Sequence, residues 1–123
     1  MDQAKMLITK IISWLTTQYS NPKTLGNYTQ ACNSVLRTLL WNIGHDADAP
    51  LTQEQLDTAL KYTNSTFPSL RCYYALFIFT AYLEAQGCSS DRFHLLCKTK
   101  TIWADKAKAE RQEQPKKDLP LTL

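Results

Sequence analysis

Glycine and proline are scarce in this sequence, with three and five residues among 123. So few turn-forming residues are not typical of an all-β fold, whose many short strands need frequent turns. No uninterrupted apolar run reaches the ~18 to 20 residues of a membrane-spanning helix, so we expect no membrane segment. Apolar residues still make up 44% of the chain and charged residues 20%, which argues against wholesale disorder. We therefore expect one folded domain with a buried core.

Recognisable chemical motifs are also missing. The four cysteines form no CxxC pair, and with the two histidines they show no zinc-binding spacing. The sequence has no glycine-rich phosphate loop, no HExxH and no nucleophile elbow, and Asp46 and Asp48 lack the remaining ligands of a calcium loop. We predict no metal, no cofactor and no catalytic residues. A small helical enzyme stays open only if a pocket brings His45 or His94 to a cysteine.

The cysteines and the N-terminus suggest an intracellular protein. The chain is apolar enough to fold without disulfides, so we expect reduced, partly buried thiols. The N-terminus starts with an acidic residue and has no small-residue cleavage pattern, so we expect no signal peptide. The corresponding location is the cytoplasm or nucleoid, or the nucleus if the protein is eukaryotic or viral.

Apolar residues recur at helical spacing in five segments, which predicts an all-α domain. The apolar centre of the fourth segment, residues 73–79, is hydrophobic nearly all round. A strand is the alternative over 72–79, but the pattern continues helically to Leu83 and Ala85, so we expect a central buried helix. The expected helices span residues 3–19, 22–42, 52–62, 67–86 and 89 to about 106. Their expected caps and stops are Ser20 or Asn21, Gly44, the Thr52/Gln55 capping box, Gly87 and residues 89–91.

Positive charge is concentrated at the C-terminal end. Residues 1–97 carry seven basic and seven acidic side chains, whereas residues 98–123 carry seven basic and four acidic ones. We therefore divide the chain into a helical domain, residues 1–104, and an extended basic tail, residues 105–123. A basic tail favours a polyanionic partner because lysine and arginine release counterions from phosphates, although a solvated terminus accounts for the same charges.

Two helix starts carry polar side chains of the types that contact DNA. In the second helix these are Lys23, Thr24, Asn27, Gln30 and Arg37. Such residues bind phosphates and base edges, and free N–H groups at a helix N-terminus attract anions. Capping and solvation explain the same residues without a ligand. The start of the fourth helix offers a similar set: Asn64, Ser65, Thr66, Ser69 and Arg71.

The order of these signals resembles the core-binding domain of tyrosine recombinases, the phage-type integrases. Residues 20–28 (SNPKTLGNY) are similar to the opening of that domain's second helix, and residues 51–56 (LTQEQL) to the short helix that follows. Residues 69–87 are similar to its long apolar helix ending in glycine, and residues 114–122 (QPKKDLPLT) to the linker before a catalytic domain. The resemblance covers about residues 5–123, and it lies in the order and spacing of the motifs.

The resemblance implies a SAM-like orthogonal bundle of four or five helices that forms half of a clamp around DNA. Its second and fourth helices would face the major groove, and its linker would cross the duplex. Tyr28 falls on the apolar stripe, so we expect its ring to pack with the hydroxyl at the edge. The residues implied by position, together with Arg37 from the polar face, are Lys23, Thr24, Asn27, Arg37, Ser69, Arg71, Tyr74, Lys98, Lys100, Lys116 and Lys117.

One departure from the family decides the expected activity. The family's catalytic arginine, lysine, His-x-x-Arg and nucleophilic tyrosine are in a separate domain, and neither His45 nor His94 is followed by arginine at the third position. We therefore expect a non-catalytic module that binds duplex DNA, and other recombinase protomers on that DNA. The alternative is a helical protein-interaction (adaptor) domain, in which Trp14 and Trp41, at the edges of their apolar stripes, serve as exposed anchors.

Overall fold

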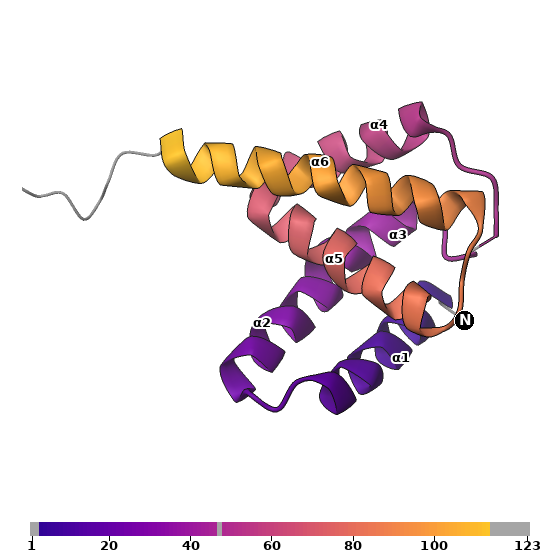
Figure 1. Cartoon of the computed structure of the whole chain (residues 1–123), viewed down its shortest axis with the longest axis vertical. Coiled ribbons are helices and arrows are strands. Elements are labelled where there is room, and N and C mark those ends of the chain that lie inside the picture. The colour runs from indigo at the N-terminus through magenta and orange to yellow at the C-terminus, as the bar shows by residue number, and fades with distance from the viewer. Residues whose placement is uncertain (1–2, 47, 114–123) are drawn as a thin grey trace, which may run out of the picture.

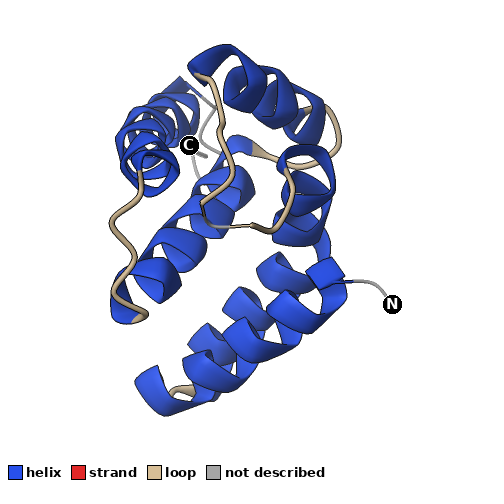
Figure 2. Cartoon of the chain, turned by 90° about the vertical axis from the view of Figure 1, so that its right-hand side faces the viewer, coloured by secondary structure: helices blue, strands red, loops and turns tan. Residues whose placement is uncertain are grey.

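The computed structural model describes residues 3–46 and 48–113, and all of their regular structure is helical (Figures 1 and 2). The predicted all-α class is therefore confirmed for this part of the chain. The helices cross one another in several directions (Figure 1). In chain order they are α1 (Gln3–Gln18), α2 (Pro22–Ala31), the π-helical segment η1 (Cys32–Leu36), α3 (Arg37–Ile43), α4 (Gln53–Asn64), α5 (Ser69–Ala85) and α6 (Asp91–Glu113).

Side-chain caps begin the helices where the sequence predicts them. The Asn21 side chain accepts hydrogen bonds from the N–H groups of Lys23 at 2.9 Å and Thr24 at 3.3 Å. Thr52 and Gln55 form a reciprocal capping box at the start of α4, with both bonds 3.0 Å long. Each cap pairs N–H groups that have no partner within the helix, which fixes where α2 and α4 begin.

Glycines end two of the helices. Gly44, after α3, has a φ of 84°, and Gly87, after α5, has a φ of 78°. This left-handed region is unfavourable for residues with a Cβ, so glycine ends both helices at little steric cost. The next helix starts close to the second of these turns, where Ser90 Oγ accepts a 3.2 Å hydrogen bond from the N–H of Phe93.

The predicted second helix is continuous from Pro22 to Ile43, but its middle turn is a π-helix, η1. Two hydroxyl groups donate to backbone carbonyls around this turn, Ser34 to Gln30 at 2.7 Å and Thr38 to Ser34 at 2.9 Å. Side-chain bonds of this kind compete with the regular backbone ladder. A π turn holds about one more residue than an α turn, so it rotates all later side chains by roughly 100° about the axis.

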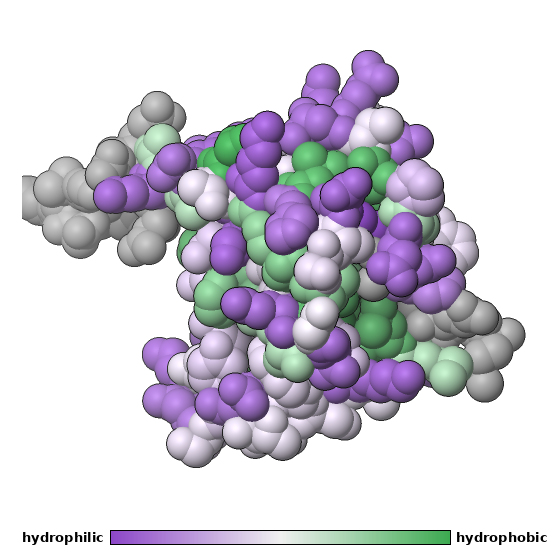
Figure 3. Space-filling view, turned by 45° about the vertical axis from the view of Figure 1, so that its right-hand side comes forward, coloured by the Kyte–Doolittle hydropathy of each residue, from purple (hydrophilic) through white to green (hydrophobic). Residues whose placement is uncertain are grey.

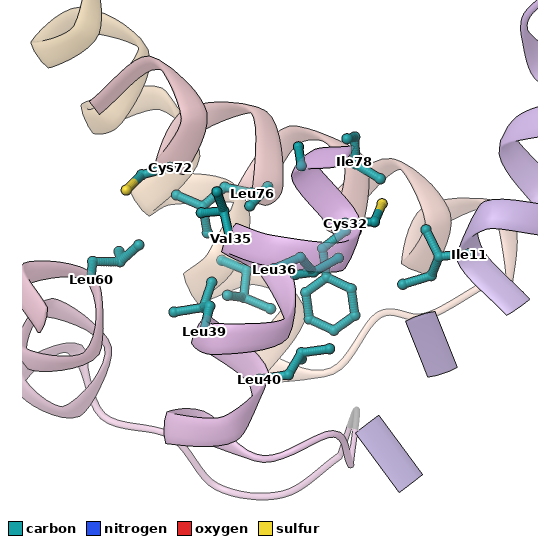
Figure 4. Close-up of a cluster of buried hydrophobic side chains, with 14 of the residues drawn as sticks. Ile11, Cys32, Val35, Leu36, Leu39, Leu40, Leu60, Cys72, Leu76 and Ile78 are labelled. Atoms are coloured by element: carbon teal, nitrogen blue, oxygen red, sulfur yellow. The ribbon is translucent and has the colours of Figure 1, made fainter. Parts of the chain in front are cut away.

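Helix α5 is the central element, as its apolar composition predicts. It contacts α1, α2, η1, α4 and α6. Its Leu76 and Ile78 pack with Cys32 and Leu36 of η1, all of them at most 1% exposed (Figure 4). A helix that is apolar on most sides needs neighbours on most sides, and this arrangement provides them.

Helix α6 runs nine residues past the predicted end of the helical domain. Ala107, which lies past that predicted end, is buried. The Lys106 ammonium lies 4.4 Å from the centre of the Trp103 ring on the same helix. The polar composition suggested a helix that fades from about residue 106, whereas the helix continues to Glu113 and its Glu110 accepts a hydrogen bond from Ser69 of α5. The division between residues 104 and 105 stays a prediction. Lys116 and Lys117 of the predicted tail lie outside the described residues.

On the face shown in Figure 3, hydrophilic side chains surround smaller hydrophobic areas. No helix in the described ranges is both long and apolar enough to cross a membrane.

Candidate nucleic-acid interface

Five half-buried aromatic rings join the residue after α1, the second half of α2 and the first half of α5. We call Tyr19, Tyr28, Tyr73, Tyr74 and Phe77 the aromatic cluster. Tyr28 is at its centre, with ring centroids 5.2 Å from Tyr19, 5.7 Å from Tyr74 and 6.2 Å from Phe77. Burial, followed by the hydroxyls of Tyr19, Tyr74 and Tyr73, raises the pKa of Tyr28, so its phenol stays protonated and can donate a hydrogen bond. The cluster fixes α2 against α5 and agrees with the predicted packing of Tyr28.

The predicted α2 residues lie beside this cluster or one turn from it. Thr24 is half-buried and precedes Tyr28 by four residues, so the two share a face of the helix. Lys23 and Asn27 are exposed. The N–H groups of Lys23 and Thr24 are already bound by Asn21, so these backbone donors are not open to an anion. An anion at this end would therefore be bound mainly by side chains.

Ser69, the first residue of α5, is not at the surface. It is 1% exposed, and its hydroxyl donates to Glu110 Oε2 at 2.8 Å, with Asn64 Oδ1 at 3.3 Å. The prediction that Ser69 contacts DNA is wrong, because α6 extends far enough to cover it. Two other predicted α5 residues fit a surface role: Arg71 is half-buried, and Tyr74 belongs to the aromatic cluster.

Of the two predicted lysines on α6, only Lys100 contacts the aromatic cluster. Its ammonium lies 5.9 Å from the centre of the Phe77 ring, within the range of a cation–π contact. Lys98 is exposed two residues earlier, which places it about 200° around the helix, on another side. Thus α6 brings one predicted cation to the cluster and directs the other away.

Arg37 has different neighbours from the rest of the predicted set. It is the first residue of α3, beyond the π turn. It lines a groove of about 280 Å³ together with Trp41 of α3 and Tyr62 of α4. The rotation introduced by η1 accounts for this separation from Lys23, because the prediction assumed an uninterrupted α-helical period. Arg37 therefore belongs to a second surface.

The two tryptophans considered as anchors differ in exposure. Trp14 is half-buried, with its ring 5.7 Å from that of Tyr82 in an edge-on contact, so it closes the core. Trp41 is 80% exposed, and nearby Tyr62 is 60% exposed. The anchor interpretation therefore keeps only Trp41.

A buried arginine that the sequence analysis did not select holds the loop between α3 and α4. Arg92 is 4% exposed, and its Nη2 donates to the carbonyls of Ile43 at 2.8 Å and Gly44 at 2.6 Å. Burial lowers the pKa of its guanidinium and the charge of Asp46 opposes that shift. One signal in the sequence could have identified Arg92. It is a cation in the first turn of a helix, where the helix dipole disfavours positive charge unless another group binds the side chain. Its role here is structural.

One groove brings a histidine and a cysteine to the same lining, which is part of what an enzyme of this size would need. His45 and Cys88 both line an open groove of about 580 Å³. The Cys88 sulfur lies 3.5 Å from Ser90 Oγ, and no hydrogen bond joins it to His45 in the described part of the chain. A nucleophile needs an adjacent base, so shared lining alone gives no catalytic pair.

The other cysteines offer no reactive thiolate. All four cysteines are free thiols, and burial raises the pKa of Cys32 to about 12 and that of Cys72 to about 11. Burial also raises the pKa of Cys97. Within residues 3–46 and 48–113, no three His, Cys, Asp or Glu side chains are grouped to hold a metal ion.

Comparisons with protein-family models, with curated proteins and with solved structures find no match to this chain.

Proposed function

We propose that this chain is a non-catalytic DNA-binding module of a site-specific recombinase or integrase, and that it contacts duplex DNA with one surface of α2, α5 and α6. The observation that carries the proposal is the contact between Tyr28 and Tyr74, with Lys100 on the neighbouring Phe77 ring. These contacts join three helices on which predicted DNA-binding residues lie. A SAM-like arrangement of the helices is part of the same proposal.

In this proposal, cations bind the phosphate backbone. Lys23, Arg71 and Lys100 supply the positive charges, and their pairing with phosphates releases counterions. Thr24 and Asn27 donate hydrogen bonds to phosphates or base edges beside them. Ser69 is no longer included because it is buried, and Arg37 and Lys98 are left out because they lie on other surfaces.

The small net charge of +3 implies weak binding by the isolated chain, with a dissociation constant of micromolar order or above at physiological salt. DNA cleavage would require a catalytic domain supplied elsewhere in the parent protein or by another chain. Other recombinase protomers on the same DNA would be its protein partners. A DNA-binding role also implies an intracellular location, in the nucleoid or nucleus.

Fluorescence anisotropy on duplex DNA, measured over a range of salt concentrations, tests the proposal. The triple variant Lys23→Gln, Arg71→Gln, Lys100→Gln is expected to weaken binding roughly tenfold or more. Its log–log salt slope should fall by up to about 0.9 for each phosphate contact removed. A control triple variant with the same loss of charge on other surfaces, Lys10→Gln, Lys61→Gln, Lys98→Gln, should retain most of the affinity. Equal losses in both variants would contradict the proposed surface, and no salt-dependent binding by the natural sequence would contradict DNA binding.

A second candidate function, the protein-interaction domain, is favoured by the 80% exposure of Trp41. Exposed tryptophans are frequent among the residues that dominate protein interfaces. The same salt titration separates the two functions, because the DNA-binding module predicts salt-dependent binding to DNA and the interaction domain predicts none.

A further inference from the structure

The aromatic cluster gathers four phenol hydroxyls that the fold leaves without partners. They belong to Tyr19, Tyr28, Tyr73 and Tyr74, and we call them the phenol site. In the part of the chain that the structure describes, none of these hydroxyls makes a hydrogen bond. In that same part, Arg92 Nε is the one buried side-chain nitrogen or oxygen without a partner, so the unbonded phenol oxygens reach the solvent. The rings therefore pack inside the fold, whereas their hydroxyls are open to a ligand.

The members of the phenol site lie close to one another. The centre of the Tyr28 ring is 5.2 Å from that of Tyr19 and 5.7 Å from that of Tyr74, and the Tyr73 and Tyr74 rings are 5.9 Å apart. Burial, and after it the other three hydroxyls, raises the pKa of Tyr28, and the second effect acts only between groups that are near each other. Hydroxyls from three segments of the chain are thus brought to one place.

A cation lies at the same cluster. The Lys100 ammonium is 5.9 Å from the centre of the Phe77 ring, which in turn lies 6.1 Å from the Tyr73 ring and 6.2 Å from the Tyr28 ring. Phenol hydroxyls and an ammonium together suit an oxyanion that accepts several hydrogen bonds. A backbone phosphate of DNA is such an oxyanion, and tyrosine hydroxyls are among the side-chain groups that bind it in known complexes.

We propose that the phenol site binds one backbone phosphate of the DNA, with the hydroxyls of Tyr28 and Tyr74 donating to its oxygens. This inference rests on the proposed DNA-binding function and adds neutral donors to its surface. A phenol donates without carrying a charge, so it replaces no counterion of the phosphate. The phenol site therefore contributes affinity that does not depend on salt, whereas Lys23, Arg71 and Lys100 contribute affinity that does.

Phenylalanine removes a hydroxyl and keeps the ring, so it tests the phenol site without removing the packing of the cluster. In fluorescence anisotropy, the double variant Tyr28→Phe, Tyr74→Phe should bind duplex DNA roughly tenfold more weakly, because two donors to a charged group are lost. Its log–log salt slope should equal that of the natural sequence, because no cation is removed. Circular dichroism checks that the fold is unchanged.

The matched control removes two phenol hydroxyls outside the cluster. Tyr62 lies on α4 and is 60% exposed, and Tyr82 is half-buried on α5, where its ring contacts that of Trp14. The double variant Tyr62→Phe, Tyr82→Phe should bind DNA as the natural sequence does. A loss equal to that of Tyr28→Phe, Tyr74→Phe would overturn the inference, because the effect would not belong to the phenol site.

A titration without DNA separates the phenol site from the proposed function. Inorganic phosphate is added to the natural chain with isotope-labelled tyrosine rings, and the ring signals are followed by NMR. The signals of Tyr28 and Tyr74 should shift, and the signal of Tyr82 should not. Sodium chloride at the same ionic strength should leave all three in place, because chloride accepts hydrogen bonds from phenols less well than phosphate does.

The outcomes for the two proposals are distinct. If the natural sequence binds DNA, anisotropy decides: equal affinity in Tyr28→Phe, Tyr74→Phe, or a smaller salt slope in that variant, overturns the phenol site and leaves DNA binding in place. If the natural sequence does not bind DNA, the phosphate titration decides. Shifts at Tyr28 and Tyr74 then support a phosphate site in a protein with another function, and no shifts overturn both proposals.

Discussion

Two groups of aromatic side chains lie at the surface of this molecule in different ways. In the aromatic cluster every ring is half-buried and contacts at least one other ring of the group. The second group, which we call the Trp41 patch, is Trp41 of α3 and Tyr62 of α4, which line one groove and are 80% and 60% exposed. The rings of the first group pack on one another and fix α2 against α5. What remains exposed for a ligand is mainly their polar edges and the neighbouring cations. The rings of the second group make few contacts within the folded chain, so their apolar surface is available to a partner.

The largest expected difference between the two regions is in stability. Tyr28→Ala should lower the free energy of unfolding by about 2 to 3 kcal/mol, because it removes a half-buried ring and its three ring contacts. Trp41→Ala should change it by less than about 0.5 kcal/mol, as for most exposed positions. Urea denaturation measures both values. Similar losses in the two variants would contradict this contrast.

Arg92 should affect stability nearly as strongly, because it fixes the loop that joins the two helices of the Trp41 patch. Arg92→Met should cost about 1 to 3 kcal/mol, since it leaves the partly buried bonds to the carbonyls of Ile43 and Gly44 without their charged donor. Lys98→Met, an exposed position on the same helix, should cost less than about 0.5 kcal/mol. Thermal denaturation compares the two. No loss in Arg92→Met would show that the loop is held by other contacts.

The buried thiols predict a smaller effect, which depends on pH. Cys32 and Cys72 have raised pKa values in the folded protein, so above about pH 9 the folded state binds more protons than the unfolded one. Their contribution to stability is complete below that pH and is lost as the pH rises toward the folded pKa values. We expect a loss of about 1 to 2 kcal/mol between about pH 8 and about pH 9.5. In urea denaturation, Cys32→Ala should flatten this decrease. An equal slope in the variant would show that other groups cause it.

Local signals in the sequence predicted where most helices begin and end. Asn21, the Thr52/Gln55 box, Gly44 and Gly87 act through hydrogen bonds and backbone angles within a few residues, so no tertiary information was needed. The all-α class followed from the same periodicity.

The features that the sequence analysis missed depend on contacts between distant segments or on irregular helix geometry. Ser69 is buried because Glu110, 41 residues later, lies over it. The π turn changes the face on which Arg37 lies, and no spacing rule revealed it. Trp14 and Trp41 were both named as exposed anchors in the alternative function, and the sequence did not distinguish them, because a residue at the edge of an apolar stripe is buried or exposed according to its neighbouring helix.

The most direct test of the proposed DNA interface is an NMR titration of the isotope-labelled chain with duplex DNA at low salt. The proposal predicts that the amide signals of residues 23–28, 71–77 and around Lys100 shift together as DNA is added. It also predicts that the signals of residues 37–42 and 58–62, which include the Trp41 patch, remain unchanged. Shifts confined to that second region, or no shifts at all, would contradict it.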